Sequence, residues 1–130
     1  MNVPSIDLET FFIHGAEALT SSDVQELRRL TPNLAPKLES MPPSVVEVMQ
    51  PVIGFATRVL HDEGFNLENA WCREIAFALR YFLKGVDIIP DMLGEIGYAD
   101  DLAMFRFAFQ RNAAELELFA SRSRLIVPEC

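Results

Sequence analysis

The run AFALRYFL at residues 76–83 constrains the fold more than any other part of the sequence, because it is apolar on nearly every side of a helix. A helix of this kind must be surrounded by other parts of the protein, so it is usually central. Asn66 and Gly85 are suited to begin and end it, which predicts a helix over residues 66–84. The rest of the chain is therefore expected to pack around this segment.

Helix start and stop signals organise the remaining sequence, whereas strand signals are weak throughout. Ser5 is suited to cap a first helix, and Ser22 and Ser44 each begin a capping box. Thr31-Pro32 should end the second helix, because the residue before a proline is pushed out of the α region. The predicted helices cover residues 6–19, 22–30, 44–61, 66–84 and about 100–122, with a linker-like wrap over 31–43 that has room for one helical turn.

These signals predict an all-α fold: a single domain over residues 1–130 with about five helices, the last two forming an antiparallel hairpin. Pro51 should kink or divide the helix in which it lies, and Gly64 fits a left-handed position after that helix. Asn112 occupies a seam position between Phe109 and Leu116 in the last helix, where a polar residue typically fixes register.

Charge and composition exclude some classes of function. Asp and Glu number 19 against 11 Lys and Arg, and the net charge of −8 disfavours general nucleic-acid binding and anionic membrane surfaces. The longest uncharged stretch is too short to span a bilayer, so membrane insertion is not expected. Cys72 and the terminal Cys130 make a poor disulfide framework, and no signal peptide is evident, which predicts a cytoplasmic protein.

The connector between the last two predicted helices concentrates negative charge. Four aspartates lie within a span of fifteen residues: Asp87, Asp91, Asp100 and Asp101. In a structural interpretation, Asp87 caps a helical turn that contains Pro90, and Asp100 caps the last helix. Three cations along one stripe of the preceding helix could then pair with the carboxylates: Arg73, Arg80 and Lys84. In the alternative interpretation, the carboxylates hold a divalent cation such as Mg²⁺ or Ca²⁺.

Three blocks in this region occur in order: YFL at residues 81–83, DIIPD at 87–91 and GYADD at 97–101. Together they resemble the hallmark of the YkvA-like family of bacterial domains of unknown function, over about residues 70–110. The matching motif residues are Tyr81, Asp87, Pro90, Asp91, Gly97, Tyr98, Asp100 and Asp101. The resemblance implies a helical domain and a place to look for a site, but it implies no reaction.

A second candidate metal site is the His61-Asp62 pair, with His14 upstream, because imidazoles and carboxylates together bind metals that activate water. The leading prediction for function is nevertheless a non-catalytic interaction or scaffold module with a protein partner. No cofactor is expected, although a divalent cation would be compatible with the acidic connector. The alternatives are a metal-dependent hydrolase at the connector or at His61-Asp62, and an acidic inhibitor protein; homo-oligomerisation is left open.

Overall fold

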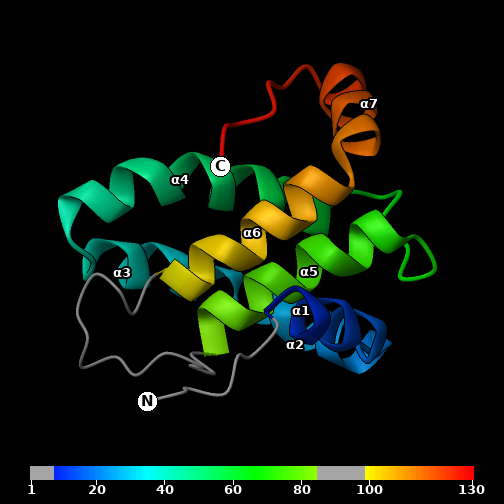
Figure 1. The fold of residues 1–130 in the computed structure, drawn as a ribbon, viewed down its shortest axis with the longest axis horizontal. Helices are drawn as coiled ribbons and strands as arrows, with labels where there is room; N and C mark the ends of the chain where they lie inside the picture. The colour runs from blue at the N-terminus through cyan, green and yellow to red at the C-terminus, as the bar shows by residue number, and fades with distance from the viewer. Residues whose placement is uncertain (1–7, 85–98) are drawn as a thin grey trace, which may run out of the picture.

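The computed structural model describes residues 8–84 and 99–130, which form helices and no strand (Figure 1). The predicted all-α class is confirmed. In chain order the elements are α1 (Leu8–Glu17), α2 (Ser21–Leu30), the 3₁₀ helix η1 (Thr31–Asn33), α3 (Leu34–Glu39), α4 (Pro43–Leu60), α5 (Ala70–Lys84), α6 (Ala99–Arg111) and α7 (Ala113–Ser123).

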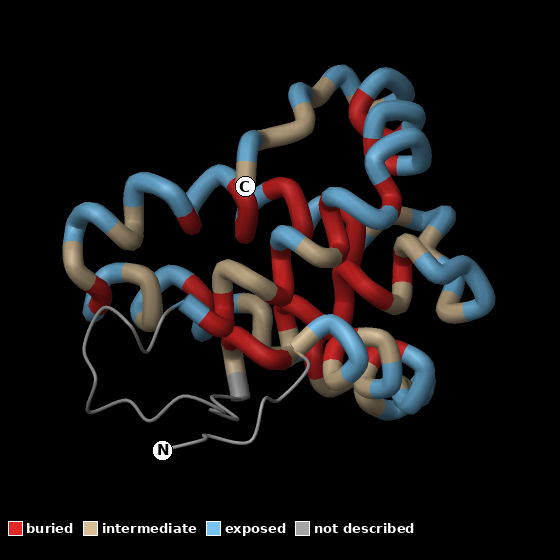
Figure 2. The backbone as a smooth tube through the Cα atoms, in the orientation of Figure 1, coloured by how far each residue is buried: buried red, intermediate tan, exposed pale blue. Residues whose placement is uncertain are grey.

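Helix α5 is the centre of the structure, as its apolar sequence predicts. It contacts α1, α2, α4 and α6. Six of its side chains are completely buried: Cys72, Ile75, Ala76, Ala78, Leu79 and Phe82. Figure 2 shows that buried backbone gathers on α5 and its neighbours, whereas exposed residues cover the outer sides of α1, α2 and α7. One hydrophobic cluster draws residues from α1 through α7.

Helices α5 and α6 run in opposite directions (Figure 1). Tyr81 near the end of α5 contacts Asp100 at the start of α6, whereas Glu74 near the start of α5 contacts Arg111 at the end of α6. These polar contacts lie one toward each end of α5.

Two predicted helix starts are wrong by one or more residues. Helix α2 is capped by Thr20, whose Oγ1 accepts from the backbone N–H of Asp23 at 3.2 Å while the Asp23 carboxylate accepts from Thr20 N–H at 3.0 Å. Helix α4 begins at Pro43, and Pro42 in the cap position makes no side-chain hydrogen bond. A proline in the first turn is pre-organised for a helix and loses no bond there, so α4 needs no capping box at Ser44.

Residues 31–43 hold more helix than the predicted linker-like wrap. Thr31 keeps helical dihedral angles, with φ −50° and ψ −39°, so Pro32 does not force the residue before it out of the α region. The path continues through η1 directly into α3. Pro32 is tolerated because it occupies the first turn of η1, where its missing N–H would have had no partner.

Pro51 and Gly64 were both expected to shape the chain in and after α4. Helix α4 runs through Pro51 as one element, so the proline does not divide the helix, and the alternative of a kink stays a prediction. Gly64 does not adopt a left-handed φ; instead its N–H donates to the Asp62 carboxylate at 2.9 Å. His61 is the C-cap residue of α4, and its backbone N–H donates to Thr57 O.

The helix predicted over residues 66–84 starts later. The Asn66 side chain accepts from Glu68 N–H at 2.9 Å and shapes a turn, while helical bonding begins where Arg73 N–H donates to Asn69 O. The single helix predicted over about 100–122 is instead two helices, because α6 ends at Arg111 and α7 begins at Ala113. Asn112 between them is buried, but it marks a helix break rather than a seam position within one helix.

Candidate functional site

The acidic connector lies only partly within the described residues. Asp87 and Asp91 fall outside them, as do the motif residues Pro90, Gly97 and Tyr98. Asp100 and Asp101 lie in the first turn of α6 and are only 0% and 4% exposed. Two carboxylates in this position are favoured by the positive end of the helix dipole.

Asp100 is joined to the central helix by a motif residue. The Tyr81 hydroxyl of α5 donates to Asp100 Oδ2 at 2.5 Å, and both side chains are buried. Because α6 already begins at Ala99, Asp100 lies inside the helix and not at the cap position that the sequence predicts. The buried Oδ1 of Asp100 makes no hydrogen bond to any residue that the structure describes. The contact therefore links the end of α5 to the start of α6.

Two of the three cations predicted to pair with the connector have described contacts with other parts of the fold. Arg73 donates to the backbone oxygens of Leu67 and Glu68, at 2.9 and 3.1 Å. Arg80 pairs with Asp23 of α2 at 3.7 Å. The side chain of Lys84 lies outside what the structure describes. The described contacts of Arg73 and Arg80 are therefore with the α4–α5 turn and with α2. Their pairing with the connector carboxylates stays a prediction, since Asp87 and Asp91 lie outside the described residues.

The His61-Asp62 pair contacts other elements of the fold as well as its own turn. His61 Nε2 lies 3.0 Å from the Thr31 hydroxyl. Asp62 accepts from the Gly64 N–H and lies 3.5 Å from Nη2 of Arg122 on α7. Over residues 8–84 and 99–130, no three His, Cys, Asp or Glu side chains come together as metal ligands, and His14 is not brought to this pair.

A buried polar network that the sequence did not predict joins α5 to the break between α6 and α7. The Glu74 carboxylate, 5% exposed, accepts from Arg111 Nε at 2.9 Å and Nη2 at 3.3 Å. Asn112 Nδ2 donates to Glu74 Oε1 and to Ala108 O, both at 2.8 Å. The hydrogen bond to Glu74 raises the pKa of Arg111. Glu74 is the one acidic residue of the largely apolar α5, and that isolation was the signal in the sequence for a buried polar contact. The contacts of Glu74 hold the helices together.

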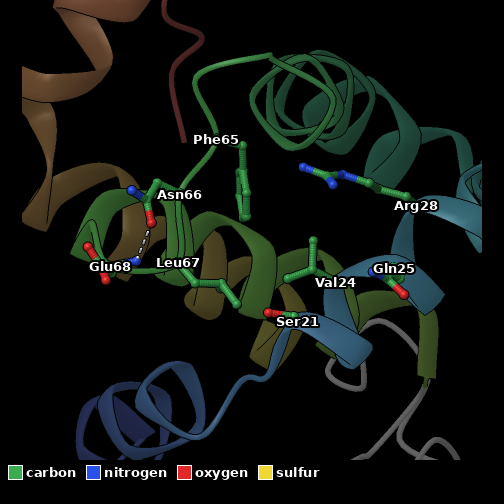
Figure 3. Close-up of a pocket in the computed structure, with 8 residues that line it drawn as sticks. All are labelled: Ser21, Val24, Gln25, Arg28, Phe65, Asn66, Leu67 and Glu68. Carbon is green, nitrogen blue, oxygen red and sulfur yellow. Dashed lines mark hydrogen bonds between the residues drawn. The ribbon is translucent and has the colours of Figure 1, made fainter.

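A groove with both apolar and polar lining residues lies between α2 and the α4–α5 turn. Its volume is about 450 Å³. Its lining comes from two short segments: Ser21, Val24, Gln25 and Arg28 of α2, and Phe65, Asn66, Leu67 and Glu68 of the turn (Figure 3). We call this surface the α2 groove.

The floor of the α2 groove is apolar and its rim is polar. Figure 3 shows Val24, Phe65 and Leu67 directed toward its middle. Val24 is buried, Phe65 and Leu67 are half-buried, and the hydrophilic side chains around them are exposed except for Arg28. An apolar floor with a few convergent polar groups is the usual composition of a binding site.

Arg28 is held in a fixed position at one end of the α2 groove. Its Nε donates to Leu60 O at the end of α4 at 3.0 Å, and its guanidinium carbon lies 5.2 Å from the centre of the Phe65 ring. No protein partner within the described residues holds its two terminal nitrogens. The guanidinium can therefore receive a carboxylate or a carbonyl group without first rearranging.

No helix among the described residues is long and apolar enough to cross a membrane.

Comparisons with curated proteins and with solved structures found no match. Residues 74–107 match the family described as "Protein of unknown function (DUF1232)". The match spans α5 from Glu74 and most of α6, and it contains the Tyr81–Asp100 contact. The chain thus carries a domain of unknown function in this segment, and the narrower YkvA-like resemblance stays a prediction.

Proposed function

We propose that this protein is a non-catalytic, cytoplasmic interaction module that binds an extended segment of a partner protein in the α2 groove. The observation that carries the proposal is the shape and chemistry of the groove: about 450 Å³, an apolar floor and a polar rim with a pre-positioned guanidinium. A peptide can bury an apolar side chain against Val24, Phe65 and Leu67 while its backbone meets the polar rim.

The rim supports binding of extended backbone. Ser21, Gln25 and Asn66 line it and are exposed. Their hydroxyl and amide groups both donate and accept hydrogen bonds. An extended segment carries unpaired N–H and C=O groups along its length, so donors and acceptors on one rim suit it better than they suit a helix.

The contacts of the other candidate residues favour this proposal over a metal-dependent hydrolase. His61 contacts Thr31, and Asp62 contacts Gly64 and Arg122, so structural contacts account for the positions of both side chains. Asp100 accepts from Tyr81 at a helix junction. A catalytic metal would need an open coordination position among converging ligands.

The test is a peptide selection followed by mapping on the full chain. Peptides selected from a displayed random library should shift the backbone amide resonances of residues 21–28 and 65–68. Gln25→Trp places a bulky side chain at the rim and should weaken the selected peptides about tenfold, the equivalent of one strong interface contact. Ser22→Trp is the control, because Ser22 is also exposed on α2 but does not line the groove.

The control should change affinity by less than about twofold, well under the loss that marks an interface hot spot. Selected peptides that shift amides on another face, and that bind Gln25→Trp as well as wild type, would refute the proposal.

A further inference from the structure

We infer that the α2 groove recognises a partner segment in which one Asp or Glu lies two residues from an apolar residue, with the carboxylate on Arg28. This inference rests on the proposed function and names the chemistry of its partner. It follows from three properties of the groove: the fixed guanidinium, its distance from the apolar floor, and the charges around it.

The guanidinium is the first property. Nε of Arg28 is occupied by Leu60 O, and the ring of Phe65 supports one face of the group. The edge that carries the two terminal nitrogens is left for a ligand, and a planar pair of N–H donors matches a carboxylate in two parallel hydrogen bonds. Because Leu60 O and Phe65 already fix the side chain, little conformational entropy is lost when an anion binds.

The spacing is the second property. Arg28 and Val24 are four residues apart on α2, so they are neighbours on one helix face with Cβ atoms about 5–6 Å apart. In an extended peptide, residues i and i+2 point to the same side and lie about 6.6 Å apart. An apolar residue above Val24 therefore places the side chain two residues away at Arg28.

Charge is the third property. Glu68 lines the groove as well, and Figure 3 shows it on the opposite side from Arg28. A carboxylate at the Glu68 side would be repelled. The protein as a whole carries −8, so a partner with a run of acidic residues would be repelled before it docked. The groove thus favours a single acidic residue in a segment of otherwise low charge.

Three displayed pools of nine-residue peptides test the inference. Each has Leu at position 4, random flanks, and Asp, Asn or Lys at position 6. On wild-type protein at low salt, the Asp pool should be enriched about tenfold over the Asn pool, which corresponds to one charge-assisted hydrogen-bonded contact. The Lys pool should fall below both, and high salt should reduce the preference for Asp.

Two variants that each remove one positive charge from α2 separate contact from net charge. Arg28→Gln should abolish the preference for Asp. Arg29→Gln should keep it, because Arg29 is exposed on α2 outside the groove. Arg28→Lys is the substitute if the Gln variant does not fold, and it should keep part of the preference because it retains the charge but not the planar pair of donors.

The outcomes distinguish the two proposals. Equal enrichment of the Asp and Asn pools, with amide shifts at residues 21–28 and 65–68, overturns the acidic motif and leaves the groove as a peptide site. A preference for Asp that Arg28→Gln and Arg29→Gln reduce alike also overturns it, because net charge would then be the cause. If no pool shifts the amides of the groove, both the motif and the proposed function are wrong.

Discussion

Gly15 of α1 and Gly54 of α4 are predicted to respond to the same substitution with opposite signs. A Cβ at Gly15 would lie 2.2 Å from Cε1 and 2.4 Å from Cζ of Phe77 on α5. A Cβ at Gly54 would meet no atom within 4 Å. Both glycines are helical, so the difference between the two variants isolates the packing of α1 on α5.

The clash at Gly15 is hard to relieve because the Phe77 ring is confined. Its centre lies 5.9 Å from that of Phe11, 5.8 Å from that of Phe12 and 6.2 Å from that of Tyr81. Carbon atoms pack at about 3.5–4.0 Å, so the ring or α1 must move by more than about 1 Å. Overpacking of this kind costs about 1–3 kcal/mol, against which alanine returns up to about 1 kcal/mol of helix propensity over glycine.

Gly15→Ala should therefore lower the free energy of unfolding by about 1 kcal/mol and at most about 2, which is a fall of about 3–8 °C in Tm. Gly54→Ala should raise the free energy of unfolding by about 0.5–1 kcal/mol, since it gains propensity without a clash. Urea unfolding followed by circular dichroism, with thermal melts alongside, measures both variants.

A double variant makes the test specific to the contact. Gly15→Ala should be less harmful when Phe77→Leu removes ring atoms from its path, with a coupling energy above about 0.5 kcal/mol. If Gly15→Ala stabilises the protein as much as Gly54→Ala does, or if its effect adds independently to that of Phe77→Leu, then α1 does not approach α5 through Gly15 and this account of the core is refuted.

Three further predictions concern polar groups that are buried or partly buried. Tyr81→Phe should lower the free energy of unfolding by about 1–3 kcal/mol because it removes the hydroxyl that donates to Asp100. Asp100→Asn should lower it less, since an amide oxygen still accepts this hydrogen bond. If Mg²⁺ raises the Tm of the wild type and Asp100→Asn abolishes that rise, a metal site is favoured instead. Glu74→Ala should cost about 1–3 kcal/mol in denaturant unfolding because the buried Asn112 amide loses an acceptor, and a loss below about 0.5 kcal/mol would contradict that role. Burial raises the pKa of Cys130 from 9.0 to about 11, so the folded state holds the thiol proton more tightly than the unfolded state does. Its contribution to stability is present below pH 9.0 and is lost as the pH rises toward about 11, and Cys130→Ser should remove this part of the alkaline stability curve.

The helical class and the central position of α5 could be predicted from the sequence because both depend on local pattern. Residues 76–83 are apolar on nearly every side of a helix, and only a surrounded helix can satisfy that composition. The positions of helix starts were less certain, since several residues near each start could cap. Thr20 prevailed over Ser22 because the Asp23 carboxylate reaches back to the Thr20 N–H.

Tertiary structure decided which partners the polar side chains of α5 and α6 found. The motif could place Tyr81 and Asp100 in one segment, but their contact required α6 to fold back along α5. Glu74 and Asn112 likewise met only through that pairing, and their hydrogen bond accompanies the break in the last predicted helix.

The α2 groove was also beyond the reach of sequence pattern. Its two sides, residues 21–28 and 65–68, are far apart in the chain, and the only signals they carry in the sequence are for helix starts. They lie together because α2 and the α4–α5 turn both dock near the central helix: Arg80 of α5 pairs with Asp23, and Arg73 holds the carbonyl of Leu67. The local sequence determines which side of each helix must be buried. How the helices pack on one another determines which of the remaining polar residues lie side by side at the surface and line a groove.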